Sequence, residues 1–112
     1  MKRQALVDGG WFDADASVEI KEGTRWDGNN HVSLATGSQW DHEVLHVTKK
    51  GRFVVNHWSQ WQGSGETYVE ITPAEAAQWL VANERDEDEL PPTRVKGESF
   101  LVLGVFGEVL DP

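Results

Sequence analysis

Histidine and acidic side chains occur close together in the middle of the sequence, where they could transfer protons or bind a metal ion. Acid–base or nucleophilic catalysis needs a base held beside an oriented partner. The G-x-S-x-G, P-loop, dinucleotide-binding and H-E-x-x-H signatures are all missing from the chain. The sequence therefore favours a non-enzymatic protein, with a small hydrolase-like enzyme that uses histidine and a carboxylate as an alternative. The candidates for that chemistry are Asp27, Asp41, His42, Glu43, His57 and Ser59.

A metal site is not expected at the histidines. His42 and His46 are four residues apart, a spacing that holds zinc when the two residues lie on a helix. Their segment alternates as a strand does, and a rise of ~3.3 Å per residue would place the two rings about 13 Å apart. The chain has no cysteine, which excludes disulfides, thiolate metal sites and iron–sulfur clusters. We expect no metal and no other cofactor, and we expect the histidines to lie half-exposed on strands.

Tryptophans surrounded by amides are the second group of residues that could bind a ligand. The chain has six tryptophans, and the stretch NHWSQWQGSGETY at 56–68 places two of them among Asn, His, Ser and Gln. One interpretation is an aromatic cluster at the edge of the core, tied by amide hydrogen bonds. The other is a binding surface for a peptide, a sugar or a protein loop. The residues predicted for this surface are Trp40, His42, Asn56, Trp58, Gln60 and Trp61.

Acidic residues dominate the charge of the chain, which has 19 acidic and 10 basic residues and a net charge of −9. Phosphate backbones attract Lys and Arg clusters, so direct binding to nucleic acid is disfavoured. The segment 84–92 is expected to be an acidic, proline-containing linker. The alternative is a nucleic-acid mimic or antitoxin-like inhibitor that binds another protein through this run. The residues of this acidic patch are Glu84, Asp86, Glu87, Asp88 and Glu89.

Length and composition indicate one globular domain spanning residues 1–112. A chain of 112 residues has the usual size of a single domain. No apolar run approaches the ~20 residues of a membrane helix, so no membrane contact is expected. The N-terminus has no long apolar segment after its basic start, which argues against a secretory signal. Together with the lack of cysteine, this favours a cytoplasmic protein.

The clearest predicted element is a β-hairpin over 42–58, with a loop at Lys49-Lys50-Gly51. Glycine in the last position of a three-residue loop adopts the left-handed conformation that such a loop needs. Alternation then places one apolar set of side chains on one face of the sheet and a mixed set on the other. The expected pairs are Val47 with Phe53, Leu45 with Val55, His46 with Val54, Val44 with Asn56, and His42 with Trp58.

Other segments complete a predicted α+β fold. DGNN at 27–30 predicts a turn between the two short strands of a hairpin. In ETYVEI at 66–71 the side chains alternate as they do in a strand. Thr72, Pro73 and Glu75 form a capping box that starts a helix over 73–83, with Trp79 on its buried face. The apolar segment 99–110 predicts a final strand. We expect an antiparallel meander sheet of four or five strands packed on this one helix in the C-terminal half.

Four segments of the chain resemble a group of small bacterial proteins. They are WDGNNHVS at 26–33, TGSQWDHEVL at 36–45, WSQWQG at 58–63 and EAAQWL at 75–80. The resemblance extends over residues 10–83 and not over the segment from Thr93 onward. No function is established for the group, so the resemblance implies a bacterial or mobile-element source and no mechanism.

Overall fold

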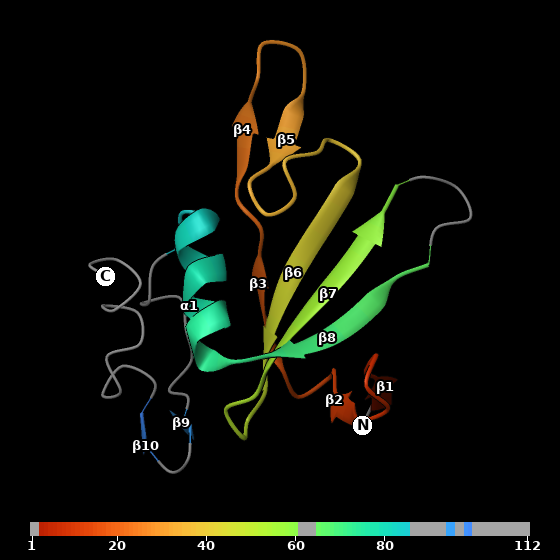
Figure 1. Ribbon diagram of the computed structural model, residues 1–112, viewed down its shortest axis with the longest axis vertical. Helices are drawn as coiled ribbons and strands as arrows, with labels where there is room; N and C mark the ends of the chain where they lie inside the picture. The colour runs from red at the N-terminus through yellow and green to blue at the C-terminus, as the bar shows by residue number, and fades with distance from the viewer. Residues whose placement is uncertain (1–2, 61–64, 86–93, 96–97, 100–112) are drawn as a thin grey trace.

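The computed structural model describes residues 3–60, 65–85, 94–95 and 98–99, and it is mostly β with one helix (Figure 1). The described strands form antiparallel sheets, the largest of which has four strands. The elements are β1 (Arg3–Ala5), β2 (Trp11–Asp13), β3 (Val18–Lys21), β4 (Thr24–Trp26), β5 (His31–Ser33), β6 (Asp41–Val47), β7 (Phe53–Ser59), β8 (Thr67–Ile71), α1 (Pro73–Ala82), β9 (Arg94–Val95) and β10 (Glu98–Ser99).

The four-stranded sheet has the order β3-β6-β7-β8. Its centre is the β6–β7 hairpin, whose register is the predicted one from Val47 opposite Phe53 to His42 opposite Trp58. Two hydrogen bonds close the loop. The Thr48 amide donates to the Arg52 carbonyl (3.0 Å), and the Gly51 amide donates to the Thr48 carbonyl (3.0 Å). Gly51 has φ +81°, the left-handed conformation that favours glycine. The predicted hairpin is confirmed.

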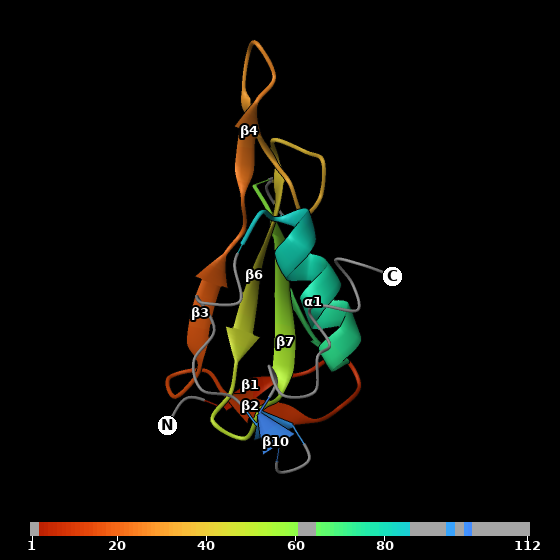
Figure 2. The same ribbon diagram turned by 90° about the vertical axis from the view of Figure 1, so that its left-hand side faces the viewer.

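Helix α1 covers one face of this sheet (Figure 2). Thr72 caps the helix by accepting the Glu75 amide, and the Glu75 carboxylate accepts the Thr72 amide in return. The hydrogen bond that this carboxylate accepts from the Thr72 amide favours the charged form, and together with the Thr72 side chain it holds the pKa of Glu75 below its ordinary value. The predicted capping box and the burial of Trp79 are thus confirmed. The apolar core between helix and sheet contains Ile20, Leu45, Val47, Phe53, Val55, Ala76, Ala77, Trp79 and Leu80.

A short ribbon, β1–β2, packs near the β6–β7 turn on the other face of the sheet. Its buried side chains, Leu6 and Phe12, contact Val54 in a second apolar cluster. The ring of His46 lies 5.4 Å from the ring of Phe12 and is only 4% exposed. Its Nδ1 lies 3.1 Å from the Ser17 hydroxyl. The expectation of a half-exposed histidine is therefore wrong for His46, because the N-terminal ribbon covers it.

A second ribbon, β4–β5, extends away from the sheet at the opposite end of the molecule (Figure 1). Its turn is the predicted DGNN segment, in which the Asp27 carboxylate accepts the amides of Asn29 (2.8 Å) and Asn30 (2.7 Å). These amides favour the charged form and lower the pKa of Asp27. The ribbon lies between β3 and β6 in the sequence but forms a separate sheet. In the four-stranded sheet, β3 is therefore followed directly by β6.

The helix ends at Ala82, with Asn83 as its cap. Glu84 has φ +56°, and the Glu84 and Arg85 amides donate to the Val81 (3.1 Å) and Leu80 (2.8 Å) carbonyls. This is a Schellman ending with glutamate at a position that usually holds glycine. Residues 86–89 of the predicted acidic patch and most of the predicted final strand at 99–110 lie outside the described residues.

The end of the helix contacts the segment that follows β3. The Gly23 amide donates to the Asn83 side-chain oxygen (3.0 Å), and the Asn83 amide group donates to the Trp79 carbonyl (2.8 Å). A Cβ added to Gly23 would collide with the Asn83 carbonyl oxygen and lie 2.8 Å from Leu34 Cδ1. Glycine is therefore required at position 23 for close packing.

We expect Gly23→Ala to lower the free energy of unfolding by about 1–3 kcal/mol, as overpacking of a fixed backbone contact does. Urea unfolding followed by tryptophan fluorescence measures this change. Gly65→Ala is the matched control, because no atom of the described residues lies within 4 Å of a Cβ at that position. Equal stability of the two variants would contradict the close contact between Gly23 and Asn83.

Candidate functional site

The open end of the β6–β7 hairpin carries several of the predicted binding residues. The Gln60 amide donates to the Trp40 carbonyl (2.8 Å), so pairing continues past the ends of both strands. The His42 and Trp58 rings lie 5.7 Å apart with an angle of 35° between their planes. Trp40 is 42% exposed, Gln60 is exposed and Trp58 is half-buried. We call Trp40, His42, Trp58 and Gln60 the aromatic rim.

The aromatic rim lies on the face of the sheet opposite α1. Side chains alternate between faces along a strand, and His42 is in step with His46, which packs against Phe12 of the N-terminal ribbon. Asn56 lies on the same face but is 8% exposed, and its amide donates to the Thr67 carbonyl (3.2 Å). Asn56 thus ties β7 to β8. Trp61, the remaining predicted binding residue, lies outside the described residues.

Glu22 fixes the position of His42. Its carboxylate accepts three groups: His42 Nδ1 (2.6 Å), the Glu43 amide (2.7 Å) and the Ser33 hydroxyl (2.8 Å). The Glu22 side chain is 11% exposed and that of His42 is 16% exposed. An ionised carboxylate only accepts hydrogen bonds, so we expect a proton on His42 Nδ1. His42 Nε2 is buried and has no hydrogen-bond partner among the described residues.

The chain around Glu22 is in turn held by the end of the helix. Arg85 donates from Nε to the Lys21 carbonyl (2.9 Å) and from Nη2 to the Glu22 carbonyl (3.0 Å). These bonds satisfy backbone oxygens where β3 leaves the sheet, and Asn83 satisfies the next amide at Gly23. Glu22, Asn83 and Arg85 were not among the residues predicted from the sequence to form a site.

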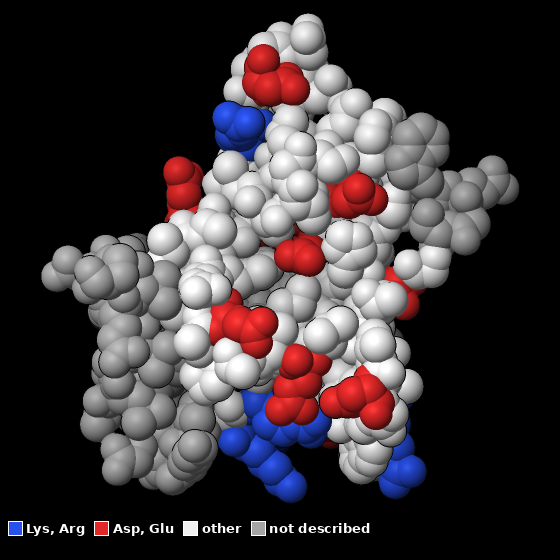
Figure 3. All heavy atoms as spheres, viewed as in Figure 1, with Lys and Arg blue, Asp and Glu red and all other residues white. Residues whose placement is uncertain are grey.

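A groove of about 590 Å³ lies on the helix side of the sheet, between α1 and strands β7 and β8. The Glu43 carboxylate stands in it, accepting from the Trp79 indole (3.1 Å) and lying 3.2 Å from His57 Nδ1. Figure 3 shows this side of the molecule, over which acidic side chains are spread. The groove is lined by Ala35, Glu43, Val55, His57, Thr67, Val69, Ile71, Glu75, Gln78, Trp79, Ala82 and Asn83.

The structure separates the candidates for proton chemistry into different places. His42 and Glu43 are neighbours in sequence, but His42 pairs with Glu22 on one face of the sheet and Glu43 with His57 on the other. Asp27 lies in the turn of the β4–β5 ribbon. Among residues 3–60 and 65–85, no group of three or more His, Asp or Glu side chains is arranged to hold a metal ion.

Comparisons with models of protein families, with curated proteins and with solved structures find no match for this chain. No helix within the described residues is long and apolar enough to cross a membrane.

We expect Glu22→Gln to destabilise the fold by about 1–3 kcal/mol. The amide that replaces the carboxylate keeps one acceptor oxygen, so at least one buried donor loses its partner. The measurement is denaturant unfolding of both proteins, with Glu19→Gln as the control, because Glu19 is an exposed carboxylate on the neighbouring strand β3. An unchanged midpoint for Glu22→Gln would show that the carboxylate does not hold these groups.

Proposed function

We propose that this protein is a non-enzymatic interaction module that binds another protein through the aromatic rim. The observation that carries the proposal is the exposure of Trp40, which is 42% accessible at a rim where Trp58 is also partly open. Tryptophan is strongly enriched among the residues that dominate binding energy in protein interfaces. Contact between aromatic surface and water is unfavourable in free energy, and binding to a partner would remove that contact.

The geometry of the rim supports recognition because two of its rings are held in place by their neighbours. The Glu22 carboxylate fixes the His42 ring, and the Trp58 indole lies against that ring. A binding surface that is already ordered loses less conformational entropy when a partner arrives. Gln60 supplies an exposed amide beside the rings, which would give the directional hydrogen bonds that aromatic contact lacks.

We expect Trp40→Ala to weaken binding to the captured partner at least tenfold while leaving the fold intact, because this side chain is 42% exposed and lies outside both apolar clusters. The partner is obtained by affinity capture from a bacterial lysate, and its dissociation constant is then measured by biolayer interferometry. Trp58→Ala should act in the same direction, with circular dichroism used to check its folding.

Trp26→Ala is the matched control, because Trp26 is 60% exposed on the β4–β5 ribbon and outside the rim. Undiminished binding by folded Trp40→Ala and Trp58→Ala proteins would refute the proposal. A loss confined to Trp26→Ala would move the binding surface to the ribbon.

A second candidate function is hydrolysis in the groove, favoured by the contact between Glu43 and His57. A carboxylate at Nδ1 orients an imidazole and leaves Nε2 as the nitrogen that can take a proton from water. The Trp79 indole holds the other carboxylate oxygen at 3.1 Å, which restrains Glu43. His57 has a side chain that is 43% exposed, so solvent reaches this pair.

For this second candidate we expect the wild-type chain to hydrolyse at least one chromogenic ester or phosphate ester faster than buffer. His57→Gln should reduce that rate by about 10²-fold or more, the usual contribution of a general base. His31→Gln, an exposed histidine on the β4–β5 ribbon, should leave it unchanged. Equal rates for the wild type and His57→Gln would exclude the groove as a hydrolytic site.

The sequence also left open an inhibitor that acts through the acidic run. The structure describes only its first two residues, of which Glu84 is exposed and Arg85 is bound to the end of β3. Arg85 is the only basic residue of the run at 84–89, and it is bound to the end of β3. The other charged residues of the run are all acidic. A steep loss of partner affinity with added salt would favour this alternative over the aromatic rim.

A further inference from the structure

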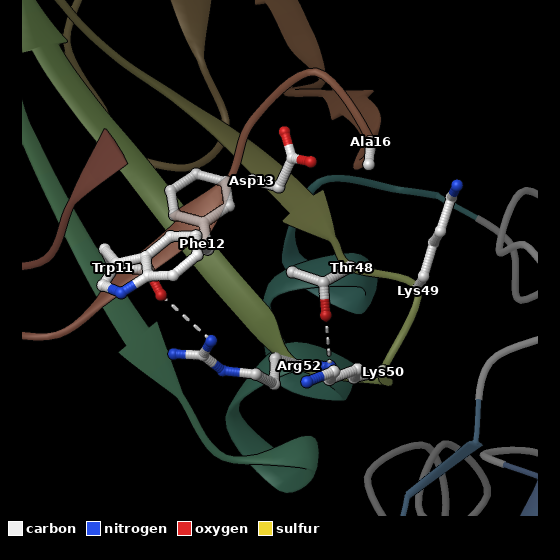
Figure 4. Close-up of a pocket in the computed structure, with 8 residues that line it drawn as sticks. All are labelled: Trp11, Phe12, Asp13, Ala16, Thr48, Lys49, Lys50 and Arg52. Carbon is white, nitrogen blue, oxygen red and sulfur yellow. Dashed lines mark hydrogen bonds between the residues drawn. The ribbon is translucent and has the colours of Figure 1, made fainter. Parts of the chain in front are cut away.

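A cavity of about 480 Å³ lies at the end of the molecule opposite the aromatic rim, between β2 and the β6–β7 turn (Figure 4). This volume is within the range of small-molecule sites in proteins. It is separate from the groove at α1 and shares no lining residue with it. The residues that line it are Trp11, Phe12, Asp13, Ala16, Thr48, Lys49, Lys50 and Arg52.

One side of the cavity is aromatic. Figure 4 shows the Trp11 and Phe12 rings on this side, with Lys49 across the cavity from them. Trp11 is 46% exposed, while Phe12 is 2% exposed and anchored in the core beneath it. The Arg3 guanidinium lies 4.7 Å from the centre of the Trp11 ring. This cation–π contact holds the indole in place without a ligand.

The other side of the cavity is basic, in a chain whose net charge is −9. Lys49 and Lys50 are both exposed and stand side by side in the tight turn that closes the hairpin. Figure 3 shows that basic side chains gather mainly at this lower end of the molecule. Figure 4 shows their side chains leaving the turn in different directions, Lys49 across the cavity from the aromatic rings and Lys50 beside Arg52. The two positive charges would attract an anion to this side of the cavity, and their field is strongest for a ligand partly removed from water.

Arg52 has a supporting role rather than a free charge. Its Nη2 lies 2.6 Å from the Glu70 carboxylate, and its Nη1 donates to the Trp11 carbonyl at 3.1 Å. The hydrogen bond with Glu70 raises the pKa of Arg52. Arg52 therefore joins the turn, β8 and β2, and it fixes the distance between the aromatic and basic sides of the cavity.

We infer that this cavity binds a small organic anion that combines a planar ring with a phosphate or carboxylate group. The ring would stack beside Trp11, since aromatic side chains bind planar ligands through their faces. The anionic group would lie on the basic side of the cavity, where the ammonium groups of Lys49 and Lys50 act as separate point charges. This site is independent of the aromatic rim.

The test is to titrate small-molecule probes into the full chain. Binding is measured by isothermal titration calorimetry and by shifts of the amide signals of residues 48–52 in NMR spectra. The probes are adenosine 5′-monophosphate, adenosine, inorganic phosphate and benzoate. Saturable binding of adenosine monophosphate or benzoate, weakened by added salt, is expected. The stronger of these two ligands identifies the anion as phosphate or carboxylate.

The variant Lys49→Gln/Lys50→Gln should weaken that binding at least tenfold, and both lysines are exposed, so the fold should survive. Lys21→Gln, an exposed lysine on β3 outside the cavity, should bind as the wild type does. Three results would overturn the inference. They are no saturable binding of any probe at millimolar concentration, equal binding by the double variant, or binding of inorganic phosphate as tight as that of adenosine monophosphate.

Discussion

The Glu22 carboxylate is the contact on which the rest of the molecule depends. Strand β3 ends at Lys21, opposite Val44, whereas β6 begins three residues earlier, at Asp41. The first residues of β6 therefore have no neighbouring strand on this side. Glu22 replaces that neighbour by accepting the Glu43 amide, and with the same carboxylate it binds His42 and Ser33. A buried carboxylate with several donors is stable, while one without them is costly. This arrangement ties Ser33, at the end of the β4–β5 ribbon, to the start of β6 and holds the His42 ring of the aromatic rim in place.

The three candidate sites lie in different places because the sheet has two faces and the hairpin has two ends. Alternation sends the neighbours His42 and Glu43 to opposite faces, where each meets a different partner. The aromatic rim therefore forms opposite α1, and the Glu43–His57 pair forms beneath α1. At the other end, the β6–β7 turn brings its two lysines beside the N-terminal ribbon. An interaction surface, an oriented histidine and an anion cavity can thus coexist in a small chain without competing for the same residues.

Local signals in the sequence predicted the features that depend on nearby residues. The Gly51 loop and the alternation around it gave the register of β6 and β7, and the Thr72–Glu75 box gave the start of α1. Glu22 could not be found in this way, because its partners are 11, 20 and 21 residues away. Arg85 binds carbonyls 63 and 64 residues earlier in the chain. The β1–β2 ribbon was also missed, since its three-residue strands carry too short a pattern and depend on Phe12 docking beside Val54.

The most direct test of this account is the protonation of the His42 ring, observed in long-range ¹H–¹⁵N NMR spectra at neutral pH. The hydrogen bond to Glu22 predicts that His42 carries a proton on Nδ1. The Nδ1 proton should exchange slowly with water, because the pair is largely enclosed. A ring with its proton on Nε2, or one that exchanges as fast as free imidazole, would contradict the central role given to Glu22.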